Sequence, residues 1–390
     1  MQTGRRFGAA FLWGLSMPPV LIAMFLLAGC LLGGVAQARP AARVPASTAE
    51  VLEILPRGYA VLMPRRRAAS PPRATRVADA TVLLSVAART GDARLARRAD
   101  ALLSTLPAGD ATPAVLRARA FAAQHRHDFT ASLLALDRLV AADPQDGGAR
   151  FARAQVQLVR GRVDRARADC ASLAFGVASD LGLACAAAVA LRTGDHDGAA
   201  RLADRWLDTA DAEPEMRRYM STLRAESASR ARRPEADRLF LAALAVAPGD
   251  VRTLSAFARH LLATGRPRAA GRLLEGVDGD GPALQRALAA AAAGDPAAPR
   301  MAAAVGRRLE RARALGEPPE LRDEAEYQLT LRQAPDAALL LAIENFATQR
   351  DVEDVDLLVR AARASGRPDA LRGLHAWARA QRLPVPGGKP

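Results

Sequence analysis

From residue 77 onward, apolar residues recur at the three- and four-residue spacing of amphipathic helices, in segments separated by short polar turns. Most of these turns carry a glycine, and the glycines are Gly91, Gly161, Gly194, Gly265, Gly294 and Gly366. Gly161 and Gly194 are 33 residues apart, which is one repeat, and Gly194 and Gly265 are 71 apart, which is two repeats. The pattern therefore repeats every 34 residues or so, which is the length of two helices and their turns. It predicts helical hairpins that start near residues 77, 113, 147, 180, 217, 251, 280, 320 and 353.

Small residues occupy the same two places in successive units. When Gly161 is counted as position 15 of its unit, positions 8 and 20 hold Ala154 and Ala166. The same places in other units hold Ala120, Ser132, Ala187, Ala199, Ala258 and Ala270. Side chains of this size let the two helices of a hairpin approach closely, while larger residues at positions 24 and 27 pack on the following unit. Pro144 and Pro248 fall at position 32, where proline ends the second helix.

The period and the small-residue positions resemble those of tetratricopeptide (TPR) repeat proteins over roughly residues 77–383. The tryptophan usual at position 4 of that repeat is missing. The resemblance implies an all-α, TPR-like α-solenoid of about nine helical hairpins wound into a right-handed superhelix, the last three being degenerate. Three further stretches resemble a family of uncharacterised exported bacterial TPR proteins, and they are residues 124–129, 322–325 and 345–350.

The resemblance also implies where a partner binds. TPR proteins are scaffolds that hold peptides or protein surfaces in a concave groove, which positions 2, 5, 9, 12 and 13 of each unit line. At these positions we expect a partner-binding groove of Arg117, Phe121, Gln124, Phe151, Gln155, Arg192, Arg218, Ser221, Arg252 and Arg259. This set is polar to basic with two aromatic residues, which suits an extended segment with acids or a C-terminal carboxylate. The alternative is that the arginines form an ordinary solvated helix face.

Composition and charge exclude several function classes. Lys389 is the only lysine in the sequence, which excludes chemistry that needs a buried lysine, including Schiff-base, kinase-type and P-loop sites. The net charge is +14, but residues 39–76 hold eight arginines and only two acids. Much of the positive charge therefore precedes the repeats, and we expect no nucleic-acid partner.

The first 38 residues have the features of an export signal. Arg5 and Arg6 precede a long apolar stretch, and the Ala-Gln-Ala sequence that ends at Ala38 has the pattern of a signal-peptidase site. A competing Leu-Ala-Gly-Cys sequence matches the lipobox of bacterial lipoproteins and would lipidate Cys30. Both interpretations predict an exported chain, either periplasmic or lipid-anchored in the cell envelope, with membrane association only if Cys30 is lipidated.

Four segments follow from these patterns. We expect a signal peptide over residues 1–38, a Pro/Arg-rich linker over 39–76, the TPR-like repeat domain over 77–383 and a flexible tail over 384–390.

Two cysteines remain once Cys30 is removed or lipidated. Cys170 lies on the second helix of one expected unit and Cys185 on the first helix of the next. These helices pack directly on each other in a TPR-like stack, so a disulfide is sterically plausible, and an oxidising compartment favours it. It would close a loop of 15 residues and contribute on the order of 3 kcal/mol. The alternative is a pair of buried free thiols.

Candidate chemistry is sparse. His125 and His127 are the best candidates for a metal site, because imidazole is a common transition-metal ligand. Their spacing does not place both on one helix face, and a simpler interpretation is that Asp128 caps the following helix there. We expect no cofactor. No nucleophile elbow, His-Glu-x-x-His or Cys-x-x-Cys motif is present in the sequence, so it does not indicate an enzyme.

A second cluster of charged residues predicts an ionic network. Arg322, Asp323 and Glu324 open one expected helix, and Arg350 closes its partner in the same hairpin. The two ends should lie together, so we expect the acids to pair with Arg350.

The sequence thus predicts a non-catalytic protein–protein interaction scaffold of the bacterial cell envelope, which binds a partner protein or peptide in its concave groove. Two alternatives remain open. One is an assembly or biogenesis factor that binds through its outer helix faces and linker. The other is a metal-handling accessory protein that uses His125 and His127.

Overall fold

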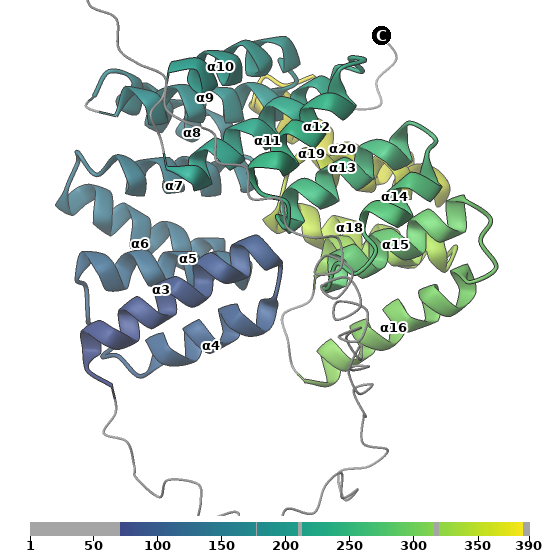
Figure 1. Cartoon of the computed structure of the whole chain (residues 1–390), viewed down its shortest axis with the longest axis horizontal. Helices are drawn as coiled ribbons and strands as arrows, with labels where there is room; N and C mark the ends of the chain where they lie inside the picture. Colours follow the sequence, from purple (N-terminus) through teal and green to yellow (C-terminus); the bar gives the residue numbers. More distant parts are fainter. Residues whose placement is uncertain (1–70, 177, 210–212, 316–319, 385–390) are drawn as a thin grey trace, which may run out of the picture. The chain divides into compact units, whose positions relative to one another are not determined.

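The computed structural model describes residues 71–176, 178–209, 213–315 and 320–384. The regular secondary structure in these ranges is entirely helical (Figure 1). The expected signal peptide, with Cys30, and nearly all of the expected linker and tail lie outside the described residues. Among the described residues, no helix is both long and apolar enough to cross a bilayer.

The described helices form nine hairpins, and the expected all-α, TPR-like solenoid is confirmed. The first five pairs are α3 (Arg73–Thr90) with α4 (Ala93–Ser104), α5 (Pro113–His125) with α6 (Phe129–Ala142), α7 (Gly147–Val159) with α8 (Val163–Ala174), α9 (Ser179–Thr193) with α10 (His196–Thr209), and α11 (Pro214–Arg230) with α12 (Ala236–Val246). Next come α13 (Val251–Ala263) with α14 (Pro267–Leu273), and α15 (Asp280–Ala292) with α16 (Ala298–Ala314). The last two are α17 (Leu321–Glu326) with α18 (Pro335–Thr348), and α19 (Val352–Ala364) with α20 (Arg372–Ala380). Each hairpin starts within a few residues of its expected position.

The first helix begins at Arg73 rather than near residue 77. It starts directly after Pro71 and Pro72, and proline is tolerated at the start of a helix but not inside one. The Arg73 guanidinium donates hydrogen bonds to a carboxylate oxygen of Asp110 at 2.6 Å and to the Thr112 hydroxyl at 2.5 Å. These contacts hold the end of the expected linker against the connection between α4 and α5.

A residue with positive φ closes the turn inside each of the nine described hairpins. The six turn glycines of the sequence pattern all have φ between 65° and 89°. Other residues take this conformation in three hairpins, namely His127, Arg232 and Gln333. The His-x-His sequence therefore belongs to the turn between α5 and α6, where His127 holds the place of the glycine.

The small residues of the repeat lie where the helices approach most closely. Ala154, Ala166, Ala187, Ala199 and the other residues at positions 8 and 20 are fully buried. The larger residues at positions 24 and 27 fill the joints between hairpins, and Trp206 and Leu136 are completely buried there. The core is accordingly a series of clusters, each shared by adjoining hairpins, as expected for a solenoid.

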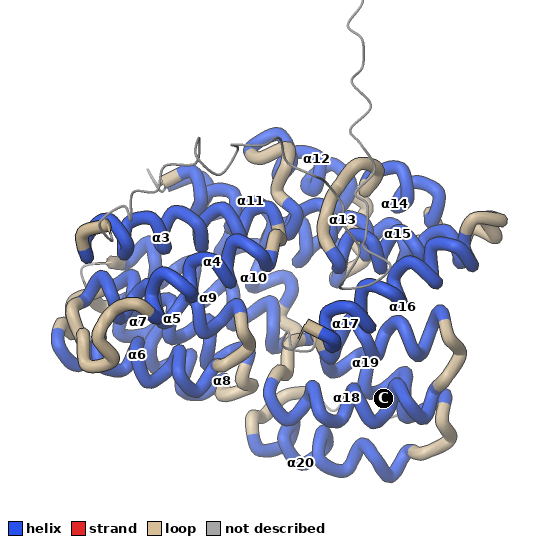
Figure 2. The backbone as a smooth tube through the Cα atoms, turned by 90° about the horizontal axis from the view of Figure 1, so that it is seen from below, coloured by secondary structure: helices blue, strands red, loops and turns tan. Residues whose placement is uncertain are grey.

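The last hairpins depart from this regularity. Helix α17 passes into a π-helical turn, Tyr327–Leu331, and a 3₁₀ turn, Pro368–Leu371, precedes α20. Figure 2 shows α18, α19 and α20 packed beside one another. Their hydrophobic cluster draws its buried members from residues 325–374, separately from the clusters of the preceding hairpins.

The stack of α3–α14 curves enough for its two ends to touch. A Cβ placed on Gly91, in the turn after α3, would lie 3.3 Å from Cγ1 of Val251 at the start of α13. Arg89, at the end of α3, lies 3.7 Å from the Glu215 carboxylate on α11. Side chains on the first helices of distant hairpins therefore lie close enough to share partners.

Candidate functional site

The expected groove residues all lie on first helices of the second to sixth hairpins. Arg117, Phe121 and Gln124 lie on α5, Phe151 and Gln155 on α7, Arg192 on α9, Arg218 and Ser221 on α11, and Arg252 and Arg259 on α13. The structure places seven of them in three sets: residues around one tyrosine, arginines held by the next hairpin, and arginines held by the C-terminal hairpins. The remaining three belong to none of these sets.

The first set surrounds Tyr219 and is called the Tyr219 cluster here. The rings of Phe151 and Tyr219 meet edge to face, with centroids 6.1 Å apart. The Tyr219 hydroxyl donates a hydrogen bond to Oε1 of Gln155 at 3.2 Å. The Arg252 guanidinium carbon lies 5.3 Å from the centroid of the tyrosine ring, which is a cation–π contact. The cluster thus joins α7, α11 and α13 across three hairpins.

Residues of α9 make this meeting possible. Helix α9 comes between α7 and α11 in the stack and contacts both. Its concave positions carry Ala184 and Ala188, which are completely buried. Because these side chains are so small, Phe151 and Tyr219 can reach each other from either side of α9. One polar atom of the cluster is left unsatisfied: Nε2 of Gln155 is buried and has no hydrogen-bond acceptor among the described residues.

Three other expected groove residues lie outside this cluster. Phe121 is 41% exposed, a high value for a large apolar side chain. The side chain of Gln124 donates to the Ala120 carbonyl of its own helix at 3.4 Å. Ser221 is half-buried on α11.

The second set consists of two arginines bound by the next hairpin. Arg117 donates to Asp146 at 2.8 Å, and Arg218 donates to Asp250 at 2.8 Å. Each aspartate is also the N-cap of the next first helix, where it accepts a backbone N–H at 2.9 Å. Each carboxylate therefore both caps a helix and forms an ion pair. Both arginines act as struts between adjacent hairpins.

The third set is bound by the start of α19. Arg192 donates to Asp351 at 2.7 Å, and Arg259 lies 3.8 Å from Glu353 and 3.7 Å from Glu226. Arg230, which the sequence analysis missed, donates to Glu353 at 2.6 Å. We call Arg192, Arg230 and Arg259 the arginine row.

The ion pairs of the row are partly shielded from water, with side chains 17% exposed at Arg192, 27% at Glu353 and 42% at Arg259. Burial by itself raises the pKa of Glu353, but Arg230, Arg259 and Arg322 outweigh it and hold this pKa far below its usual range. Burial likewise lowers the pKa of Arg192, and Asp351 reverses that effect, so the guanidinium remains charged.

The acids reach the row because the C-terminal hairpins dock on α7 and α8. The backbone N–H of Arg350 donates to the Val159 carbonyl at 2.8 Å, and the Trp377 indole N–H donates to the Gly161 carbonyl at 2.9 Å. The N–H of Val163 donates to Oε1 of Gln381 at 2.8 Å. Gly161 is essential to this fit, since a Cβ there would lie 2.7 Å from both Arg350 and Trp377.

The prediction that Asp323 and Glu324 pair with Arg350 is wrong. The Arg350 side chain donates to the Phe346 carbonyl and lies over the Phe346 and Trp377 rings. Arg322 instead lies 3.6 Å from Asp354, and Glu324 pairs with Arg313 of α16. The prediction failed because the α17–α18 hairpin packs its ends on other helices rather than only on each other.

The histidines do not assemble a metal centre in the described structure. His127 lies 3.7 Å from Glu320 and stacks on Phe129, with ring centroids 5.7 Å apart. His125 is exposed. Burial lowers the pKa of the half-buried His127 imidazole. Asp128 caps α6 by accepting the Ala131 N–H at 3.0 Å, as expected. No group of three metal-binding side chains occurs among the described residues.

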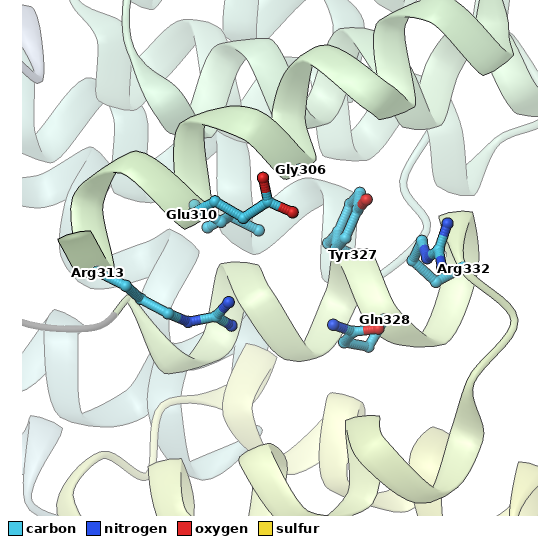
Figure 3. A pocket seen from close by; sticks show the side chains of 7 residues that line it. Gly306, Glu310, Arg313, Tyr327, Gln328 and Arg332 are labelled. Atoms are coloured by element: carbon cyan, nitrogen blue, oxygen red, sulfur yellow. The ribbon is translucent and has the colours of Figure 1, made fainter. Parts of the chain in front are cut away.

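Figure 3 shows a polar cavity of about 260 Å³ between α16 and the π-helical turn. Tyr327 lies across Gly306, where a Cβ would be 2.5 Å from the tyrosine hydroxyl. Glu310, Arg313 and Arg332 also line the cavity. Arg313 pairs with the buried carboxylate of Glu324, so this guanidinium stabilises an internal charge.

The two cysteines form a disulfide. Cys170 on α8 and Cys185 on α9 are joined, with Cα atoms 5.3 Å apart. Both residues are buried in the cluster that includes Trp206. The bridge therefore fixes the joint between the third and fourth hairpins, which carry Phe151 and Arg192.

Comparisons with known proteins report on the fold only. No protein-family model matches the chain, and no curated protein matches it. Among solved structures, a tetratricopeptide repeat protein from Parabacteroides merdae is 13% identical, with a TM-score of 0.37, and the match covers 74% of this chain and 99% of that one. Yeast Tom70 is 15% identical over 82% of this chain and 69% of its own, with a TM-score of 0.44. Human IFIT1, in a dimer with m7Gppp-AAAA, is 16% identical over 74% and 68%, with a TM-score of 0.47.

Proposed function

We propose that this chain is a non-catalytic scaffold of the bacterial cell envelope that binds an extended segment of a partner protein on its concave face. The binding surface is the Tyr219 cluster together with Phe121. The observation that carries the proposal is the buried Nε2 of Gln155, a hydrogen-bond donor without an acceptor among the described residues. Buried donors are almost always satisfied in native proteins, so a bound peptide that displaces the side chains covering Nε2 could supply a backbone carbonyl as its acceptor.

The chemistry around this donor suits a peptide. The Phe151 and Tyr219 rings offer apolar and aromatic surface, and Arg252 is exposed above Tyr219. A backbone carbonyl at Gln155, an apolar side chain against the rings and a carboxylate at Arg252 would be recognised together. Arg117 and Arg218 fall outside the proposed surface, because their guanidinium groups are already bound to cap aspartates.

Two features support a place in the cell envelope. The sequence begins with the pattern of an export signal. The Cys170–Cys185 disulfide suits an oxidising compartment outside the cytoplasm. Fractionation of the host cell, with mass spectrometry of the mature N-terminus, tests this part. A terminus after Ala38 indicates a soluble exported chain, a diacylglycerol on Cys30 indicates an anchored one, and an intact Met1 in the cytoplasm contradicts both.

A site-specific photo-crosslinker tests the concave surface. Benzoylphenylalanine is introduced at Phe121 on the concave helix α5 or, as the matched control, at Leu134 on α6, which is 66% exposed. We expect irradiation of envelope preparations to give one discrete adduct from position 121. The adduct should be lost when Gln155→Ala and Arg252→Ala are added. An adduct from position 134 alone would instead support binding through the outer helix faces.

A further inference from the structure

Two carboxylates at the start of α19, those of Asp351 and Glu353, occupy the arginine row, and we call these two residues the acidic loop. Asp351 binds Arg192 at 2.7 Å, and Glu353 binds Arg230 at 2.6 Å and lies 3.8 Å from Arg259. The row spans three successive first helices, α9, α11 and α13. Two acids placed two residues apart thus contact three hairpins, which is how an acidic peptide would lie across a concave face.

The arginine row depends on the acidic loop for its charge balance. Among the described residues, the ion-pair partner of Arg192 is Asp351 and that of Arg230 is Glu353. Arg259 has Glu226 as well. If the acidic loop left, two partly buried guanidinium groups would lose their counterions. Such groups are costly unless an anion replaces the lost partner, so the open row would select for carboxylates.

The C-terminal hairpins share an apolar cluster with α15 and α16 through Tyr327, but not with the helices that carry the arginine row. The buried members of their main hydrophobic cluster lie within residues 325–374, whereas the clusters of the helices that carry the row are formed within residues 154–223 and 225–289. The docking contacts between them are ion pairs and hydrogen bonds, with Leu383 as an added apolar contact. A polar interface of this kind can exchange with water and ions more readily than a shared apolar core.

The row is also continuous with the Tyr219 cluster. Tyr219 on α11 and Arg192 on α9 lie on first helices that contact each other. A peptide that binds Gln155 and Tyr219 and continues along the concave face therefore meets the acidic loop next.

We propose that the arginine row is a binding site for an acidic segment of the partner protein, and that the chain's own acidic loop occupies this site until the partner displaces it. This inference rests on the proposed function, because it extends the same concave surface. It assigns the partner a motif of two carboxylates separated by one residue, in the manner of Asp351 and Glu353.

A labelled peptide tests the site directly. The probe is a fluorescent synthetic peptide with the sequence of residues 348–358, and its control copy carries Asn or Gln in place of all four of its acids, at 351, 353, 354 and 356. The full chain is compared with the double variant Asp351→Asn/Glu353→Gln, which removes the negative charges of the acidic loop and leaves the arginines of the row unchanged. The matched control is Asp356→Asn, an exposed acid of the same helix that pairs with Arg360.

We expect the double variant to bind the probe at least about tenfold more tightly than the wild-type chain, because the competing loop no longer holds the site. Asp356→Asn should match wild type, and the control peptide should not bind. Adding Arg192→Gln and Arg230→Gln to the double variant should abolish binding. Binding that survives the loss of these arginines, or equal affinity for wild type and the double variant, would overturn the inference.

Hydrogen exchange reports whether the C-terminal hairpins have moved. The amides of Arg350 and Val163 donate across the docking interface, so both should exchange faster in the double variant. Fast exchange without probe binding would show an open row that does not take carboxylates, and unchanged exchange without binding would show that the acidic loop is a fixed strut. Each result refutes the proposal.

If the double variant does not fold, displacement of the acidic loop can still be tested on the wild-type chain. Wild-type chain at saturating probe should show faster exchange at Val163, and no acceleration would again refute displacement. The crosslink at position 121 is scored separately. An adduct there together with no probe binding would keep the proposed function and remove the arginine row from it.

Discussion

Arginines at the two ends of the first helices have different kinds of partner. Near the helix starts, Arg117 and Arg218 bind an aspartate that begins the next hairpin, about one repeat further along the chain. Arg192 and Arg230 instead bind acids 159 and 123 residues away. Repeat periodicity therefore fixes which helix face a side chain occupies, but it does not fix what covers that face.

The largest loss of stability that we expect comes from removing Asp250, which joins two adjacent hairpins. Asp250 is 2% exposed, accepts the Thr253 N–H and hydroxyl, and binds Arg218. Asp250→Ala should lower the free energy of unfolding by about 3–5 kcal/mol, because it removes a cap and leaves a largely buried guanidinium unpaired. Urea titration followed by circular dichroism measures this loss.

Asp146→Ala is the matched control at the equivalent place in the α5–α7 joint. The Arg117 side chain there is 40% exposed, so water replaces the lost partner. We expect a loss of about 1–2 kcal/mol, mostly from the cap. Equal losses for the two variants would show that burial does not set the strength of these contacts.

The next largest loss of stability that we expect comes from removing the disulfide, which joins the third and fourth of the regular hairpins. Replacing both Cys170 and Cys185 by alanine should cost about 3 kcal/mol in the free energy of unfolding, since the bridge closes a 15-residue loop. Reductant should weaken the wild-type chain by a similar amount and leave the double variant unchanged. A wild-type chain that is insensitive to reductant while the thiols are shown to be free would contradict the estimate.

Much of this regular part follows from local sequence. The starts at 113, 147, 251 and 280 agree with the structure, because proline, glycine and aspartate mark the helix ends there. Tyr219 was missed for a related reason. Arg232 takes the place of the turn glycine after α11, so that hairpin has no glycine to fix its register.

The C-terminal contacts could not be predicted in the same way. Glu353 was recognisable as an acid at a helix start, but its partners lie on α11 and α13. Only the curvature of the whole stack brings those helices to α19, and curvature depends on many small packing choices rather than on one motif. The π-helical turn at Tyr327 likewise has no signal in the apolar spacing.

Gly161 lies in a turn of the regular hairpins and also contacts the C-terminal hairpins, so a substitution there tests both. Gly161→Ala should cost about 2–3 kcal/mol, because a left-handed φ of 68° is strained in alanine and the new methyl meets Arg350 and Trp377. Gly265→Ala has nearly the same φ, 73°, and open space around the site. It should cost only about 1 kcal/mol. Hydrogen exchange at the Arg350 amide should rise in the first variant and not in the second; the same cost in both would mean that the C-terminal hairpins do not press on this turn.

The smallest effect that we expect is a gain in stability rather than a loss, and it comes from removing the charge of Asp323, near the start of the docked C-terminal hairpins. Burial raises the pKa of Asp323 to about 6, and Glu320 and Glu326 add to this, against the opposing effect of Arg322 and Arg259. The folded state therefore binds this proton more tightly than the unfolded chain does. Stability is lost as the pH rises from about 4 through 6.

Asp323→Asn removes the charge that causes this loss. At pH 7.5 it should raise the free energy of unfolding by about 1–2 kcal/mol, and at pH 4 the gain should vanish because the wild-type carboxyl is then protonated. Asp369→Asn, an exposed acid beside Arg372, should change stability little at either pH. Urea titrations at the two pH values decide the matter. A variant less stable than wild type at pH 7.5 would mean that the Asp323 charge supports Arg322 and Arg259, and the cluster would then contain no surplus acid.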